Sequence, residues 1–186
     1  KIVFFGGAGV STESGIPDFR SVDGLYNQKY DYPPETILSH DFFMTETEEF
    51  FRFYRDKMIW PGALPNKAHI KLSELENQAA GSKKVYELHG SVLRNYCMKC
   101  NRFYDADFIR KCSGIPRCTC GGIIKPDVVL YQEGLSDSVI NGAVTSIKEA
   151  DLLIVGGTSL NVYPAAGLIK YRSKDCFLLL INLTET

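Results

Sequence analysis

Short apolar runs alternate along this chain with longer segments in which apolar residues recur at helical spacing. The runs are bounded by glycine or polar residues, which is typical of buried parallel strands. They lie at Ile2–Phe5, Val128–Tyr131, Leu152–Val155 and Phe177–Ile181. This alternation of strand and helix signals predicts an open α/β sheet.

Four segments between or beside these runs carry the helical signal. The clearest is Thr45–Ile59, in which Phe50, Phe53 and Tyr54 share one face and a Pro-Gly pair follows. Shorter helices are predicted at His69–Glu76, Val139–Ala150 and Ala165–Arg172. The stretch 95–124 interrupts the pattern, because it is rich in cysteine and turn residues and offers little room for a hydrophobic core.

Composition and charge exclude several classes of function. The 186 residues carry a formal net charge of -1 and a pI of about 6.4, so nothing favours direct binding to nucleic acid. No run approaches the roughly 18 apolar residues of a membrane span, and no signal peptide is visible. The chain opens directly on an apolar strand, which suggests that residues before Lys1 are missing.

The cysteines indicate a metal site. Four of the six form two pairs, Cys97 with Cys100 and Cys118 with Cys120, and 17 residues separate the pairs. In a chain without secretory features this spacing predicts a structural four-thiolate zinc site in a reducing cytoplasm. The second pair has a one-residue spacer where two residues are usual, so Cys112 is a conceivable substitute ligand.

A glycine-rich segment, GGAGVS at 6–11, directly follows the first predicted strand. Glycines at such a turn let backbone N–H groups approach a diphosphate. Thr12 stands where a full GxGxxG has its third glycine, so this motif alone is equally compatible with a plain tight turn. Asp18, Phe19 and Arg20 add a carboxylate, a ring that could shield a flat ligand, and a guanidinium that could face a phosphate.

Taken together, residues 7–21, GAGVSTESGIPDFRS, closely resemble the cofactor-binding signature of the sirtuin family. The resemblance continues in the family's order through ELHG at 87–90, the first cysteine pair, KPDVVLY at 125–131, GTSL at 157–160 and IN at 181–182. It implies a Rossmann-like doubly wound parallel sheet formed by 1–94 and 125–186, with a small zinc-binding domain inserted at 95–124.

The resemblance also implies an activity, the NAD-dependent removal of acyl groups from protein lysines, with acetyl favoured and with nicotinamide and O-acyl-ADP-ribose released. His89 matches the family's general base, which accepts a proton from a ribose hydroxyl. An acyl-lysine peptide would bind as an extended strand along 128–131 and 157–163. The implied NAD contacts are Gly7, Ala8, Gly9, Ser11, Thr12, Asp18, Phe19, Arg20, Gly157, Thr158, Ser159, Asn182 and Leu183, and the implied zinc ligands are Cys97, Cys100, Cys118 and Cys120.

Two departures from the family bear on function. The family's Gln-Asn-Ile-Asp strand is absent, so we predict that an internal segment is missing near 76–77. The family's chain usually continues beyond the position of Thr186, so we also predict that this chain is a fragment at that end. Sirtuins that favour succinyl or malonyl groups carry a Tyr and an Arg three residues apart on a helix, where this chain has Phe51 and Tyr54. A neutral acyl group is therefore expected, because no cation would pair with a substrate carboxylate.

Other functions remain open at this point. An NAD-dependent protein mono-ADP-ribosyltransferase would use the same pocket. A non-catalytic ADP-ribose-binding module is disfavoured by His89 in its family context, and a Rossmann dehydrogenase by the incomplete GxGxxG.

Overall fold

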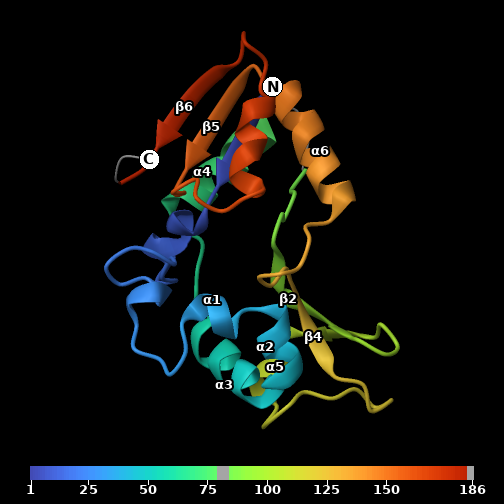
Figure 1. The fold of residues 1–186 in the computed structure, drawn as a ribbon. Helices are drawn as coiled ribbons and strands as arrows, with labels where there is room; N and C mark the ends of the chain where they lie inside the picture. Colours follow the sequence, from blue (N-terminus) through green and yellow to red (C-terminus); the bar gives the residue numbers. More distant parts are fainter. Residues whose placement is uncertain (79–83, 184–186) are drawn as a thin grey trace. The chain divides into compact units, whose positions relative to one another are not determined.

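The computed structural model describes residues 1–78 and 84–183, without the side chains of 76–78, and the chain forms two compact units (Figure 1). The first unit consists of Lys1–Asn27, Gly62–Leu88 and Ser136–Thr186, and the second of Gln28–Pro61 and His89–Leu135. The domain division drawn from the sequence stays a prediction. The unit that holds the two cysteine pairs is larger than 95–124, because 28–61 belongs to it.

A parallel sheet forms the centre of the first unit. Its strands are β1 (Ile2–Gly6), β5 (Leu152–Gly156) and β6 (Phe177–Ile181), in the order β1-β5-β6 within the described residues. Figure 1 shows β5 and β6 as neighbouring arrows that point the same way. The three predicted strands are confirmed. Because they are parallel, their carboxyl ends meet at one edge of the sheet.

Helices pack on this sheet and make a Rossmann-like arrangement, as predicted. The core is made by α6 (Asp137–Lys148), by the 3-10 helix η3 (Ala165–Tyr171) and by β5, in which Leu153 and Val155 are buried. The helix α4 (Lys67–Gln78) runs through 76–77, and the residues that follow it lie outside the described ranges. The expectation that Phe177–Ile181 is buried is wrong, since all five residues are exposed in the part that the structure describes.

The second unit has an aromatic core. It is made by α1 (Pro34–Ile37), α2 (His40–Thr45) and α3 (Thr47–Lys57), and the predicted face of Phe50, Phe53 and Tyr54 is buried. The helix predicted at Thr45–Ile59 is confirmed as α3, but it begins at Thr47, because Glu46 leaves the helical conformation with φ −119° and ψ 46°. Ser39 caps α2 by accepting the N–H of Phe42.

A small antiparallel sheet completes the second unit, in the order β3 (Phe103–Asp105), β2 (Gly90–Cys97) and β4 (Ile124–Val128). The prediction of a parallel strand at Val128–Tyr131 is wrong, because the strand there ends at Val128 and pairs antiparallel with its neighbour. Pro126 lacks an N–H, and the strand accommodates it because it lies at the edge of the sheet. The helix α5 (Ala106–Lys111) follows β3 directly.

No helix in the described ranges is long and apolar enough to cross a bilayer.

Candidate functional site

Three glycines bring the loop after β1 into direct contact with the loop after β5. The N–H of Gly7 donates to the carbonyl of Gly156 at 3.0 Å, and that of Gly9 to the carbonyl of Gly157 at 2.9 Å. A Cβ on Gly7 would lie 2.5 Å from the oxygen of Gly157, and a Cβ on Gly9 would lie 2.8 Å from it. Gly157 has φ +60°, and its own Cβ would lie 2.4 Å from the nitrogen of Val10. Only glycine allows the two backbones to approach this closely.

A short helix follows the glycine turn. It is the 3-10 helix η1 (Ala8–Ser14), which contains the predicted contacts Ala8, Ser11 and Thr12. Thr12 donates its hydroxyl hydrogen to the carbonyl of Gly9 at 2.9 Å. Gly15 ends the helix with φ 80°, and its N–H donates to the carbonyl of Thr12. The turn is therefore closed by its own hydrogen bonds.

Asn66 joins this loop to α4 and was missed in the sequence. Its Nδ2 donates to the carbonyl of Val10 at 2.7 Å, while its Oδ1 accepts the N–H groups of Ala68 and His69 at 3.0 and 3.2 Å. Its own N–H donates to Nδ1 of His69 at 3.2 Å. An asparagine directly before a helical pattern is the N-cap signal that could have revealed it. His69, to which the sequence gave no role, is part of this cap.

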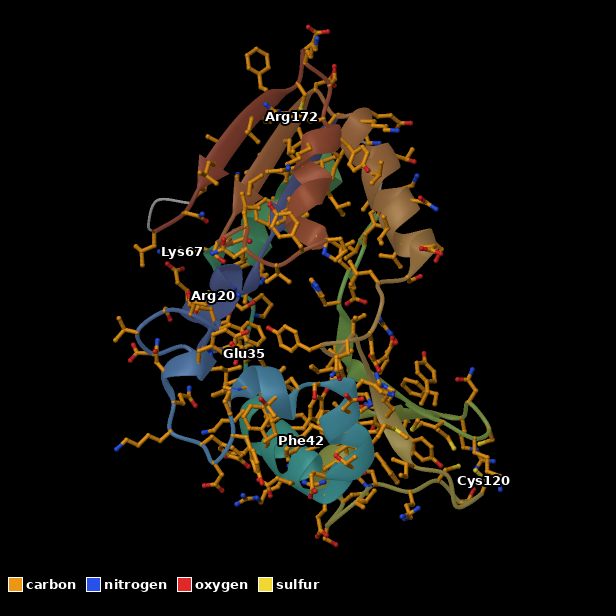
Figure 2. The ribbon with its side chains drawn as sticks, in the orientation of Figure 1. Arg20, Glu35, Phe42, Lys67, Cys120 and Arg172 are labelled. Carbon is orange, nitrogen blue, oxygen red and sulfur yellow. The ribbon has the colours of Figure 1, made fainter. Side chains whose placement is uncertain are left out.

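Polar side chains gather at the carboxyl ends of β5 and β6. Asn182 holds the backbone of Thr158 at both ends, since its Oδ1 accepts the N–H at 3.1 Å and its Nδ2 donates to the carbonyl at 2.7 Å. Arg20 (Figure 2) donates to the hydroxyl of Ser159 at 3.4 Å and lies over the ring of Tyr26, 5.4 Å from its centroid. Open α/β sheets bind their ligands at this edge.

Asp18 and Phe19 shape the loop between η1 and η2 (Leu25–Asn27). Oδ1 of Asp18 accepts the N–H groups of Arg20 and Ser21 at 3.2 and 2.9 Å, and the Phe19 ring meets Tyr26 edge-on. Leu183 is fully exposed, and Ala8, Thr12 and Arg20 are exposed as well. The residues joined by the bonds above at this edge are Gly7, Gly9, Thr12, Arg20, Gly157, Thr158, Ser159 and Asn182.

The second unit gathers four thiols in one place. The sulfurs of Cys97, Cys100, Cys118 and Cys120 lie within 4.8 Å of one another, and sulfur atoms cluster around Cys120 in Figure 2. Zn–S bonds of about 2.3 Å in a tetrahedron place the sulfurs about 3.8 Å apart. Three sulfur pairs, 97 with 120, 100 with 118 and 100 with 120, are 3.4, 3.6 and 3.5 Å apart, so the donor set fits zinc. Cys112 is not part of this cluster within the described residues.

Tight turns direct the sulfurs of the two pairs toward each other. The N–H of Lys99 donates to the sulfur of Cys97 at 3.4 Å. Gly121 has φ 82° and donates to the carbonyl of Cys118, which lets the one-residue spacer chelate. The N–H of Cys120 is the largest influence that lowers the pKa of the Cys118 thiol to about 5. The thiolate, which is the form that binds metal, is thus favoured there.

His89 directly precedes β2 in the second unit. Its carbonyl accepts the N–H of Val129 at 3.0 Å, which fixes its backbone next to the end of β4. Gly90 has φ +76°, and a Cβ there would lie 1.9 Å from the carbonyl oxygen of Asp127. His89 is exposed, yet partial desolvation lowers the pKa of its imidazole. The neutral ring, which can accept a proton, therefore predominates at pH 7.

Comparison with known families identifies a match over most of the chain. The model of the Sir2 family matches residues 7–164. Proteins named NAD-dependent protein deacetylase from Clostridium perfringens and Clostridium acetobutylicum are each 57% identical, with 100% of this chain and 84% of the relative covered. The first alignment extends over 205 positions against the 186 residues of this chain, a difference of 19. The internal gap predicted near 76–77 would account for such additional positions in the alignment, and it stays a prediction.

Solved structures agree with this match. A Sir2 with a deacetylated p53 peptide and 3′-O-acetyl ADP ribose has a TM-score of 0.87 at 38% identity, covering 100% of this chain and 82% of that chain. A Sir2 with a p53 peptide and NAD+ has a TM-score of 0.83 at 38% identity with the same coverage. A Sir2 bound to a propionylated peptide has a TM-score of 0.83 at 36% identity, again with the same coverage.

Proposed function

Since this chain belongs to the Sir2 family, we propose that it is an NAD-dependent protein-lysine deacetylase. The observation that carries the proposal is the family match over 7–164, which includes both the glycine-rich loop and His89. Relatives at 57% identity are named deacetylases, and this favours deacetylation over the alternative of protein mono-ADP-ribosylation.

The edge formed by β1, β5 and β6 fits a dinucleotide. The glycine contact keeps side chains out of the space between the two loops, and Arg20 and Ser159 lie together at the same edge. We assign the predicted NAD contacts to this edge, with the diphosphate near Ala8–Thr12 and the adenosine half near Thr158 and Asn182. When bound, NAD would supply the ribose carbon to which the acyl oxygen bonds as nicotinamide leaves; water would then release the lysine amine and leave O-acyl-ADP-ribose, and no hydride moves.

His89 is assigned the role of general base. A neutral imidazole can take a proton from a ribose hydroxyl, and the lowered pKa keeps the ring neutral at physiological pH. The hydrogen bond from Val129 to the His89 carbonyl holds the base in a fixed relation to the segment that follows β4. We place an extended acyl-lysine peptide along that segment, 128–131, where main-chain hydrogen bonds would supply affinity.

The thiolate cluster is assigned to a structural zinc. Four cysteine ligands close the tetrahedron, so the ion offers no position to a substrate or a water molecule. Cysteines that have not yet bound zinc oxidise readily outside a reducing compartment. The relatives named deacetylases are bacterial proteins. We therefore place the protein in the cytoplasm.

The test is turnover of an acetyl-lysine peptide by the complete protein and by His89→Ala. We expect deacylation to fall at least about a hundredfold, the usual contribution of a general base, while NAD affinity changes little. In the wild type, kcat/KM should fall as pH drops through a pKa below the ordinary histidine value of about 6.5, because protonation removes the base. Near-normal turnover by the variant would refute the assignment. Nicotinamide release that does not depend on acyl-lysine would instead indicate ADP-ribosyl transfer.

A further inference from the structure

A half-buried ionic cluster lies in the second unit, apart from the zinc ligands. One carboxylate oxygen of Glu133 accepts from Nζ of Lys125 at 3.0 Å, and the other lies 3.0 Å from Nδ1 of His40. The side chains of Lys125 and Glu133 are 20% and 21% exposed. Burial by itself would raise the pKa of Glu133, but the N–H of Leu130, His40 and Lys125 together lower it. The carboxylate is therefore charged.

Both charged side chains are used to hold the backbone that follows β4. The carboxylate of Glu133 accepts the N–H of Leu130 at 2.9 Å. Nζ of Lys125 donates to the carbonyl of Val128 at 2.9 Å and to that of Pro126 at 3.3 Å. Within the described residues β4 is the edge strand of its sheet and pairs with β2 on one side, and Leu130 lies beyond its end, so these side chains add hydrogen bonds that the sheet does not provide. The ion pair therefore supplies additional hydrogen bonds to the backbone of this edge strand and of the segment after it.

The same segment is also attached to the start of α2. The N–H of Tyr131 donates to the carbonyl of Leu38 at 3.0 Å, and the N–H of His40 donates to the carbonyl of Tyr131 at 2.9 Å. Gln132 has φ 76°, an uncommon conformation for a residue with a side chain. Its side chain both accepts from the N–H of Asp41 at 3.0 Å and donates to the Asp41 carboxylate at 2.9 Å. Residues 128–133 are consequently held on two sides.

We propose that Glu133, with Lys125 and His40, is a positioning residue that sets the backbone at 128–131 in the conformation that receives the acyl-lysine peptide. The inference rests on the proposed function, which places the peptide along this segment. A peptide that binds by main-chain hydrogen bonds needs those backbone groups at fixed positions, because each misdirected donor or acceptor weakens binding. In the proposed role Glu133 touches neither substrate nor cofactor and acts through the backbone.

The experiment compares Glu133→Gln, Lys125→Met and the double variant in the complete protein. Glutamine keeps an acceptor for Leu130 but loses the charge that pairs with Lys125. We expect the KM for an acetyl-lysine peptide to rise about tenfold, in line with the loss of one charge-assisted hydrogen bond. The kcat should change less than about threefold, and the KM for NAD should not change. Because the two side chains act as one unit, the double variant should be about as impaired as either single variant.

Asp107→Asn is the matched control. It also converts an acid to its amide and breaks two ion pairs, with Arg110 and Lys111, but these lie on the surface of α5. Its peptide KM should equal that of the wild type. Hydrogen exchange should accelerate at the Leu130 amide in Glu133→Gln and not in the control.

The outcomes separate the two claims. An unchanged peptide KM in Glu133→Gln, or equal increases in the KM values for peptide and NAD, would overturn the positioning role while leaving the deacetylase assignment intact. A wild type that releases no nicotinamide in the presence of acetyl-lysine would overturn the proposed function, and the role of Glu133 with it.

Discussion

Replacing Gly90 by alanine should destabilise the second unit and disturb the residue next to it, His89. Two costs combine at this position. With φ +76°, alanine would be held in the left-handed region, which costs about 1–2 kcal/mol. Its Cβ would also lie 1.9 Å from the carbonyl oxygen of Asp127, and this oxygen belongs to backbone that cannot rotate away.

The contact has to be relieved by separating β2 from β4. Gly90 pairs with Val128 and Ser91 with Asp127, so one or two backbone hydrogen bonds would weaken at about 1 kcal/mol each. The expected total is about 3 kcal/mol. For a chain of this size that corresponds to a fall in Tm of roughly 6–12 °C.

Gly114→Ala provides a matched control in the same unit. Gly114 has φ +63°, but the nearest atom to its added Cβ would be Oε1 of Glu48 at 3.8 Å, an ordinary contact. The control should therefore show only the conformational cost. Trp60, the single tryptophan of the chain, lies in this unit, so its fluorescence during urea unfolding reports the stability of both variants. Equal losses in Gly90→Ala and Gly114→Ala would refute the steric part of the reasoning. Unchanged turnover in Gly90→Ala would show that His89 does not depend on this strand pairing.

Two further predictions concern the metal and the acyl group. Elemental analysis of purified protein should find one zinc per chain, and Cys97→Ala should lose the metal and fold poorly, whereas Cys112→Ala should keep both zinc and activity. Zinc loss in Cys112→Ala with retention in Cys120→Ala would move the fourth ligand to Cys112. The kcat/KM for an acetyl-lysine peptide should exceed that for its succinyl-lysine counterpart, because Phe51 and Tyr54 are fully buried and provide no cation for a carboxylate. A succinyl preference would point to Arg55, whose guanidinium lies 5.9 Å from the centroid of the Phe51 ring.

The parts of the fold that the sequence predicted well have strong periodic signals. The strands β1, β5 and β6 are continuous apolar runs, and α3 has a full aromatic face. The cysteine pairs were also recognisable, because metal ligation demands a fixed set of residues at short spacing, and the structure brings those four sulfurs together.

The antiparallel sheet of the second unit was not predictable in the same way. The strand β2 is mostly half-buried and shows no clear alternation, and β4 contains a proline that argues against a strand. The extent of β4 is determined by its pairing with β2, a segment distant in the sequence, and not by a local pattern. The cluster of His40, Lys125 and Glu133 was missed for a related reason, since His40 is distant in the sequence and joins the other two only through the contact between α2 and the segment after β4.

The backbone contact between the β1 and β5 loops determines when the chain loses conformational entropy. The hydrogen bonds from Gly7 to Gly156 and from Gly9 to Gly157 join protein groups only and use no group of a nucleotide. Ordering a residue costs about 1–2 kcal/mol, and here that cost is met during folding. Binding of NAD to these loops therefore needs little further ordering, and more of the contact energy is available as affinity. A substitution that separates the loops would weaken the nucleotide complex even if every contacting side chain remained in place.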